Sequence, residues 1–222
     1  MKIGLLSANL GGFENPVPHV PQVMRDGSEV VSRLVTDADF PPRSKTMLPR
    51  LQMGAVKRFA WEWIPNCDVY VWVDSSVTLF RPDSVQWFVD TLGNADLALL
   101  PHPDRHSIKE EAEFLRAKLA AGNAYLTGRY ANERLDEQLA AIQECRTFND
   151  TCLYASTAFA FRDSIRARHM CKEWWFHVSK YHALDQLSLP FVVWLSHLSV
   201  NKLSGHLYRH EHLTYTRKRG RK

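Results

Sequence analysis

The sequence lacks any long apolar run. A membrane-spanning helix needs about 20 consecutive apolar residues. The longest candidate, residues 187–200, is shorter and contains Pro190 and His197. The N-terminus begins directly with a strand-like segment and shows neither the long apolar region nor the cleavage site of a signal peptide. We therefore expect a cytoplasmic protein without a membrane span.

Cysteine is also scarce. The four cysteines, Cys67, Cys145, Cys152 and Cys171, include no CxxC pair and show no zinc-site spacing. This pattern argues against a disulfide scaffold and a structural zinc site, and it predicts free thiols in a reducing compartment. A disulfide between Cys145 and Cys152 is the alternative.

The common phosphate-binding motifs are missing as well. Residues 7–12, SANLGG, follow the first predicted strand and are small enough to let a ligand approach closely. However, the chain contains no GxGxxG and no GK[ST], which excludes the usual dinucleotide fingerprint and the P-loop.

What is present describes an ordinary globular domain. The chain has 222 residues, of which 45% are hydrophobic and 23% charged, and its net charge is +4. The last six residues, 217–222, carry five positive charges and no acid. We expect one domain over residues 1–215 and a solvated, disordered basic tail at 216–222. The alternative for the tail is a site for phosphate polymers or an anionic surface.

Strands alternate with helices over the first hundred residues, which predicts an α/β fold with a mostly parallel central sheet flanked by helices. The predicted strands are residues 2–8, 30–35, 69–73, 96–100 and 154–161. The predicted helices are residues 48–63, 82–92, 108–121, 132–145, 165–181 and 184–195. The chain shows no internal repeat, linker or composition break, so a single domain is the simplest interpretation.

The most informative segment is residues 68–77, where an apolar strand ends in Asp74-Ser75-Ser76. Ligands of open α/β sheets bind beyond the carboxyl ends of the strands, so we expect Asp74 to face a ligand there. Enzymes that transfer sugars from nucleotide donors place Asp-x-Asp at this point to hold a divalent metal against the diphosphate. Here Ser76 stands in the third position. The alternative is a strand that ends in a solvated Asp turn.

Cationic side chains are expected near the same edge. The predicted helix 48–63 carries Arg50, Lys57 and Arg58, and Lys45 precedes it. Arg50 and Lys57 are seven residues apart and therefore share a helix face. Such cations could offset the charge of a diphosphate. The alternative is a solvated basic face.

Four further segments carry side chains of interest. His102, Asp104 and Arg105 follow the fourth predicted strand and suit binding of phosphate or sugar hydroxyls. Asp185-Gln186 can hold sugar hydroxyls, although Asp185 could instead cap the following helix. Trp174-Trp175 could form an apolar platform for a sugar ring, with core packing as the alternative. The histidines His206, His210 and His212 are either surface residues or the source of one metal ligand late in the chain.

Taken in order, these segments resemble a glycosyltransferase-like family that was long classed as a domain of unknown function and occurs in plant cell-wall proteins and bacterial polysaccharide loci. The resemblance runs from about residue 2 to 195 and rests on SANLGGF, VYVWVDSS, ALLPHPDRHSIKEEAE, LYASTAFAFRD and LDQLSLPFVVW. It implies a GT-A-type nucleotide-sugar transferase with one Rossmann-like domain.

The resemblance also implies roles for individual residues. It assigns the nucleoside pocket to Ala8, Asn9, Thr36 and Asp37, the metal- or diphosphate-facing carboxylate to Asp74, the active-site edge to His102 and Arg105 with Glu111 nearby, and the acceptor side to Asp185 and Gln186. Relatives usually read Arg-Asp-Gln where this chain has Leu184 before Asp185. They also lack the second Asp of the usual metal motif. Mn²⁺ or Mg²⁺ is the expected cofactor, with Asp74 and a late histidine, His206, as candidate ligands.

We therefore predict a glycosyltransferase that moves a sugar from a nucleotide-diphosphate sugar, expected to be a UDP-sugar, to a hydroxyl of a glycan or polysaccharide. The predicted catalytic residues are Asp185, Gln186 and His102, and Arg50, Lys57, Ser76 and Arg105 complete the predicted donor site. Asp185 could be the base of an inverting enzyme or could only hold the sugar in a retaining one. Two alternatives stay open: an enzyme that glycosylates hydroxylated bases of DNA, suggested by the basic tail, and a non-catalytic nucleotide-sugar-binding protein, suggested by Ser76.

Overall fold

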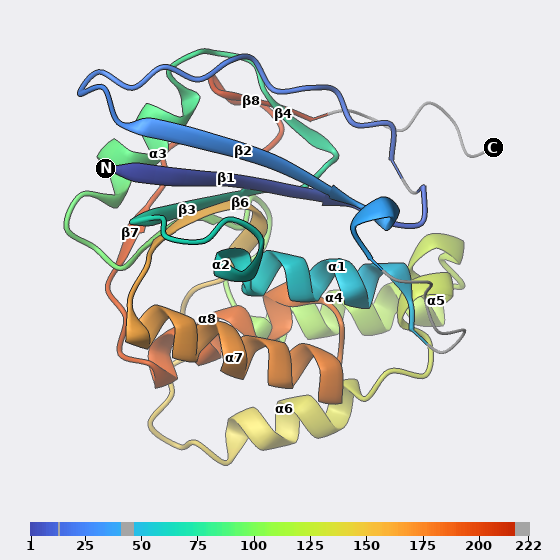
Figure 1. Ribbon diagram of the computed structural model, residues 1–222. Coiled ribbons are helices and arrows are strands. Elements are labelled where there is room, and N and C mark those ends of the chain that lie inside the picture. Colours follow the sequence, from blue (N-terminus) through green and yellow to red (C-terminus); the bar gives the residue numbers. More distant parts are fainter. Residues whose placement is uncertain (13, 41–46, 216–222) are drawn as a thin grey trace.

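The fold is built on a six-stranded mixed sheet (Figure 1). The computed structural model describes residues 1–12, 14–40 and 47–215. In the order β2-β1-β3-β6-β5-β7, the strands are β2 (Glu29–Thr36), β1 (Lys2–Asn9), β3 (Val69–Val73), β6 (Tyr154–Arg162), β5 (Leu97–Pro101) and β7 (Val200–Lys202). Within this sheet β6 is antiparallel to both neighbours and the other five strands run in one direction. The predicted α/β class with a mostly parallel sheet is confirmed.

Helices cover one face of the sheet, and a helix with a small second sheet covers the other (Figure 1). The first group is α1 (Pro49–Arg58), α2 (Ala60–Trp63), α4 (Ile108–Ala120), α5 (Ala124–Tyr130), α6 (Leu135–Gln143), α7 (Ile165–Lys180) and α8 (Leu189–Leu195). The opposite face carries α3 (Ser84–Leu92) and the pair β4 (Val77–Leu79) and β8 (Leu213–Tyr215). Two short 3₁₀ helices, η1 (Asp37–Asp39) and η2 (Asp185–Leu187), complete the described elements. No helix among the described residues is long and apolar enough to cross a bilayer.

Each face of the sheet has its own hydrophobic core because strand side chains alternate between the two faces. In β3, Tyr70 and Trp72 pack on the side of α1 and α7, whereas Val69, Val71 and Val73 pack on the side of α3. All five are almost completely buried. A strand covered on both faces reads as a continuous apolar run, which explains why β3 was recognisable in the sequence.

Several predicted boundaries are wrong. The helix predicted over 48–63 is divided at Phe59, whose backbone (φ −107°, ψ 49°) is not helical. Neither proline nor glycine marks this break. The region predicted as the helix 184–195 is η2 followed by α8, and the helix α5 and the strands β4, β7 and β8 were not predicted. Gly93 does end α3, with a positive φ of 48°.

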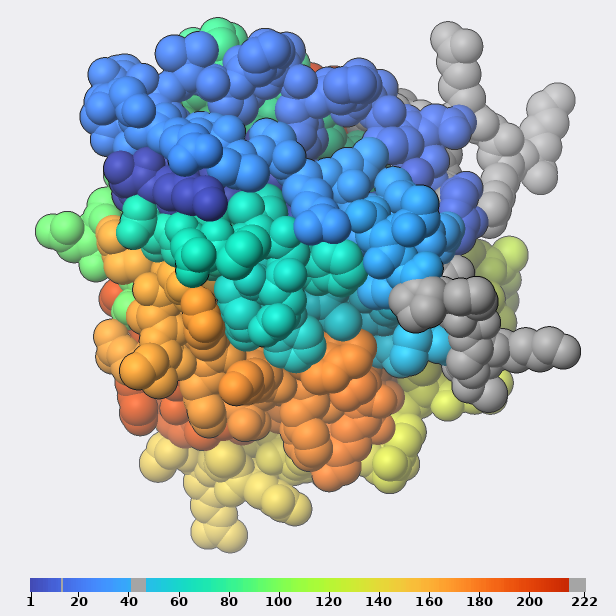
Figure 2. Space-filling model, viewed as in Figure 1, coloured from blue at the N-terminus to red at the C-terminus, as the bar shows by residue number. Residues whose placement is uncertain are grey.

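The space-filling view shows α1 and α2, in cyan and teal, between the blue N-terminal strands and the orange α7 (Figure 2). This position places one face of α1 against the sheet and another against α7.

All four cysteines are free thiols, as predicted, so Cys145 and Cys152 do not form the alternative disulfide. Lys45 and the basic tail 216–222 lie outside the described residues.

Candidate active site

Two cavities adjoin at the carboxyl ends of β1, β3 and β5. The first, of about 240 Å³, is lined by Ala8, Asn9, Leu10, Gly11, Leu48, Pro49, Arg50, Met53, Ser75, Gly128 and Arg129. The second, of about 360 Å³, is a charged chamber whose lining includes Arg50, Met53, Lys57, Asp74, His102, Arg105, Arg129, Ser156, Asp185 and Gln186. Arg50, Met53 and Arg129 line both, so the two cavities form one continuous cleft.

The wall of the smaller cavity is shaped by polar side chains that bind backbone. The Asn9 amide donates to the Glu14 carbonyl (2.9 Å) and accepts from the Glu14 N–H (3.1 Å). Asp37 accepts from the Gly11 N–H (2.7 Å), and a Cβ at Gly11 would lie 2.8 Å from Pro49. Of the predicted nucleoside pocket, Ala8 and Asn9 line the cavity. Thr36 and Asp37 are not among its lining residues, and Thr36 donates its N–H to Asp39 (2.7 Å).

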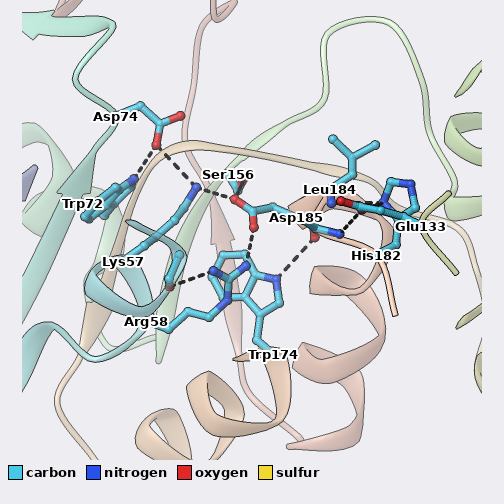
Figure 3. A network of polar contacts seen from close by, with 12 residues as sticks. Lys57, Arg58, Trp72, Asp74, Glu133, Ser156, Trp174, His182, Leu184 and Asp185 are labelled. Atoms are coloured by element: carbon cyan, nitrogen blue, oxygen red, sulfur yellow. Dashed lines mark hydrogen bonds and ion pairs between the residues drawn. The ribbon is translucent and has the colours of Figure 1, made fainter. Parts of the chain in front are cut away.

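The chamber is organised around Lys57, near the C-terminal end of α1 (Figure 3). Its ammonium donates to Asp185 Oδ2 (2.6 Å) and lies 3.5 Å from Asp74 Oδ1. Arg58 pairs with the other oxygen of Asp185, and the Ser156 hydroxyl donates to Asp185 Oδ2 (3.0 Å). The side chains of Lys57 and Arg58 are 1% and 0% exposed, which rules out the solvated basic face for these two cations.

The two carboxylates have different surroundings. Asp74 follows β3, and its Oδ1 accepts from the Trp72 indole (2.7 Å). Burial raises the pKa of Asp74, although Lys57 and the Trp72 hydrogen bond oppose the rise. Burial acts in the same direction on Asp185, but Arg58 and Lys57 outweigh it and hold the pKa of Asp185 well below its usual range. Asp185 is therefore a poor proton acceptor at neutral pH.

Arg50 stands where the two cavities meet. It pairs with Glu133, and its guanidinium lies 4.9 Å from the centre of the Tyr130 ring. Its Nη1 is buried and has no hydrogen-bond partner among the described residues. A buried, unpaired donor next to a cavity is unfavourable unless a ligand or water satisfies it, and a guanidinium is suited to phosphate oxygens.

His102 and Arg105 lie together on the chamber wall. The backbone N–H groups of Asp104 and Arg105 donate to His102 Nδ1 (3.2 and 3.1 Å), and the Arg105 guanidinium Nη2 lies 3.1 Å from His102 Nε2. Burial, and then Arg105, lower the pKa of His102 to about 4. Arg105 pairs with the buried Glu111, and burial raises the pKa of Glu111 despite that pair. His102, Arg105 and Glu111 thus line the same wall of the chamber.

Asp185 does not cap α8. That helix begins after Ser188, and the Asp185 carboxylate is directed instead to Lys57, Arg58 and Ser156. Gln186 lines the chamber beside it. Trp174 is fully buried and donates to the Asp185 carbonyl (3.3 Å), so it belongs to the core and offers no sugar platform.

Aromatic side chains that the sequence analysis missed surround the chamber instead. Tyr125, Tyr208 and Tyr215 line it and are 58%, 58% and 40% exposed. Tyr125 is on α5, and the other two lie on the segment that returns to the Asp74 turn, where Tyr215 pairs with Val77. Their positions depend on α5 and β8, which no local pattern had indicated.

The residues near Asp74 do not fit a metal ion held by protein ligands. Within the described residues no group of three or more His, Cys, Asp or Glu side chains is placed to hold one. Trp72 and Lys57 already contact Asp74 Oδ1, and the ammonium would repel a second cation at that oxygen. Ser76 lines neither cavity, whereas Ser75 lines the smaller one. His206 is exposed and lines neither cavity, although Tyr208 of the same loop lines the chamber.

No protein-family model and no curated protein matches the sequence. Among solved structures, the chain is similar to a glycosyltransferase involved in the glycosylation of the major capsid of PBCV-1. The TM-score is 0.41 at 9% identity, over 84% of this chain and 73% of that chain. It is also similar to the galactosyltransferase LgtC in complex with donor and acceptor sugar analogs (TM-score 0.41, 12% identity, 90% of this chain and 72% of that chain). Likenesses this weak do not decide a function, which depends on the residues of the cleft.

Proposed function

We propose that this protein is a glycosyltransferase that uses a nucleotide-diphosphate sugar, with a UDP-sugar as the expected donor, and a hydroxyl of a glycan as acceptor. One observation carries the proposal: a small cavity with mainly apolar walls opens into a charged chamber, and the partly unsatisfied Arg50 stands between them. A nucleoside suits the first space, a sugar the second, and a diphosphate the cation at their junction.

The donor would lie along the cleft from β1 towards η2. Its nucleoside would contact Ala8, Asn9 and Gly11, which line the smaller cavity. Its diphosphate would lie at Arg50 and near Asp74, which we propose faces it through the Lys57 ammonium. The sugar would then reach the polar groups that line the chamber around His102, Asp185 and Gln186.

The transfer places new charge on the diphosphate. The acceptor oxygen forms a bond to the anomeric carbon while the bond from that carbon to the diphosphate oxygen breaks. The electron pair of the broken bond stays on the diphosphate, and the proton of the acceptor hydroxyl passes to water. Fixed cations that face the leaving group stabilise this developing charge, which is the largest contribution we assign to the protein.

The predicted catalytic residues take holding roles in this proposal. Both oxygens of Asp185 accept from cations, and its low pKa favours binding sugar hydroxyls over taking a proton. His102 is neutral and lines the chamber beside Arg105, where the two side chains can contact a sugar oxygen. These features favour the second of the two predicted roles of Asp185, in which it holds the sugar.

The acceptor would enter past the exposed tyrosines. Sugar rings have apolar faces that stack on aromatic side chains, and Tyr125, Tyr208 and Tyr215 line the chamber with much of their surface exposed. This arrangement supports a glycan acceptor.

A thermal-shift screen of nucleoside diphosphates and nucleotide sugars, each with EDTA and with Mn²⁺, tests the proposal. A true donor binds the native state and raises the melting temperature by mass action, and UDP-sugars should give the largest increase. If no nucleotide or nucleotide sugar raises it, the proposal is wrong. Donor binding without any release of UDP would instead support the non-catalytic binding protein. Salt-sensitive binding to DNA, with transfer to a hydroxylated base, would support the nucleic-acid acceptor.

A further inference from the structure

Lys57 is an unusual place for a lysine. Its side chain is 1% exposed, and its ammonium lies 5.6–5.9 Å from the ring centres of Trp72, Phe159 and Trp174. A lysine is rarely buried without a strong reason, because removing its charge from water is costly. The two acceptors that hold it are Asp185 Oδ2, at 2.6 Å, and Asp74 Oδ1, at the long distance of 3.5 Å.

Asp185 does not by itself explain Lys57. Arg58 already pairs with Asp185 Oδ1, Ser156 donates to Oδ2, and Arg58 also binds the Gly54 carbonyl (2.9 Å). Asp185 therefore has a buried cationic partner that does not reach Asp74. Lys57 is the cation that joins Asp185 to the cavity-facing carboxylate, and the third donor of its ammonium has no acceptor among the described residues.

Asp74 leaves room for a ligand at this point. Its side chain is 30% exposed, and its Oδ2 has no hydrogen-bond partner among the described residues. Arg50 lines the same chamber with a buried, unpaired Nη1. Two cations therefore line the chamber beside Asp74: Lys57, which is 3.5 Å from Asp74 Oδ1, and Arg50, whose Nη1 is unpaired among the described residues.

We propose that Lys57, together with Arg50, supplies the positive charge opposite the donor diphosphate, so that this protein binds its donor without a divalent metal ion. The proposal rests on the function proposed above. In this arrangement the Lys57 ammonium takes the place that a metal ion bound to Asp-x-Asp would have. Asp74 orients the ammonium, and Arg58 balances the charge of Asp185.

The test is calorimetric titration of the full chain with UDP and with uridine, in excess EDTA and in excess Mn²⁺. We expect wild-type protein to bind UDP with dissociation constants that agree within about threefold in the two conditions. Lys57→Gln should weaken UDP binding by about 30-fold or more and uridine binding by less than about threefold, because only UDP carries the diphosphate. Arg58→Gln is the matched control: it removes a neighbouring buried cation from the same Asp185, and it should lower the melting temperature while UDP affinity changes by less than about threefold.

The outcomes separate the two proposals. If wild-type protein binds UDP only when Mn²⁺ is present, or if Lys57→Gln binds UDP as wild type does, the role of Lys57 is wrong and the donor site still stands. If neither UDP nor uridine binds in either condition, the proposed function itself is wrong. The comparison of EDTA with Mn²⁺ uses wild-type protein alone and therefore decides the question even if Lys57→Gln does not fold.

Discussion

The end of β3 and the start of η2 each present one carboxylate to the same lysine, yet the two carboxylates differ in how completely they are paired and in the direction of their pKa shifts. At η2, Asp185 is 16% exposed, both of its oxygens accept from cations, and its pKa is depressed. At the end of β3, Asp74 keeps one oxygen unpaired among the described residues, and burial raises its pKa. A buried charge that is fully paired with opposite charges stabilises a fold. A charge that is incompletely paired and lies next to a cavity is a candidate for function. We therefore expect Asp185 to matter most for stability and Asp74 most for activity.

The largest expected effect is on the stability of Asp185→Asn. The substitution leaves Lys57 and Arg58 buried without their shared counter-charge, which typically costs about 3–5 kcal/mol in unfolding free energy. For a chain of this length we expect the melting temperature to fall by roughly 6–20 °C in differential scanning calorimetry. Asp136→Asn is the control, because Asp136 pairs with Arg116 on the surface and should change stability by less than about 1 kcal/mol. Equal melting temperatures for wild type and Asp185→Asn would mean that the buried network does not hold the fold.

The pH dependence sharpens the same comparison. The pKa of Asp185 is lower in the folded state than the value of about 3.9 expected for an unfolded chain. The stabilisation from its ionised form is therefore complete above that value and is lost as pH falls through the folded pKa. Denaturant titrations should show that wild type loses unfolding free energy more steeply than Asp185→Asn below about pH 4. Parallel curves for the two proteins would contradict the depressed pKa.

Asp74→Asn should give the reverse result. Because the folded-state pKa of Asp74 is raised, its ionised form lowers the unfolding free energy at neutral pH, and the amide should leave the melting temperature unchanged or slightly higher. Turnover with donor and acceptor should fall by about 100-fold or more, the scale seen when a group that acts on the transition state is lost. Steady-state kinetics with Asp90→Asn as a surface control measures this effect, since Asp90 lies on α3 and pairs with Arg25. A folded Asp74→Asn protein with near-normal turnover would remove Asp74 from the site.

A smaller effect is expected at the opening of the chamber. Tyr208→Ala removes an exposed ring and should raise KM for a glycan acceptor by about 3–10-fold, which corresponds to a stacking contribution of about 0.5–1.5 kcal/mol. The donor KM should stay unchanged, and Tyr208→Phe, which keeps the ring, should behave as wild type. An equal rise in both KM values would indicate a general disturbance of the cleft and not an acceptor contact.

The smallest expected effect is that of removing residues 217–222. The segment has no apolar residue, so deletion should shift the melting temperature by less than about 1 °C. The loss of five cations should weaken binding to heparin or DNA and reduce its salt dependence. A fall of several degrees would show that the segment packs on the domain.

The parts of the fold that could be predicted are those with a local cause. The buried run of β3 and its terminal Asp74 are contiguous in sequence, and His102, Arg105 and Glu111 all lie between the end of β5 and the first turn of α4. In contrast, the three residues of β7, Val200–Lys202, are polar or partly exposed and pair with β5 only because the tertiary fold brings them there. No apolar period could have marked them.

The centre of the site could be predicted only in part. Arg50 and Lys57 were expected on one helix face, and both line the chamber. The pairing of Lys57 with Asp185 joins residues 128 positions apart, so its burial has no signature near either residue. Tyr208 was missed for the same reason, because it lies outside any helix or strand and is positioned by the return of the chain to the Asp74 turn.

The central claim is that the cleft is a donor site in which Asp74 acts on a nucleotide sugar. The most direct measurement is release of UDP from a panel of UDP-sugars without acceptor by wild type and by Asp74→Asn. Equal melting temperatures of the two proteins show that the variant is folded. Water can take the place of the acceptor, so we expect slow release of UDP from at least one donor by wild type and a loss of that release in Asp74→Asn. No release by wild type from any UDP-sugar, or equal release by the two proteins, would contradict the claim.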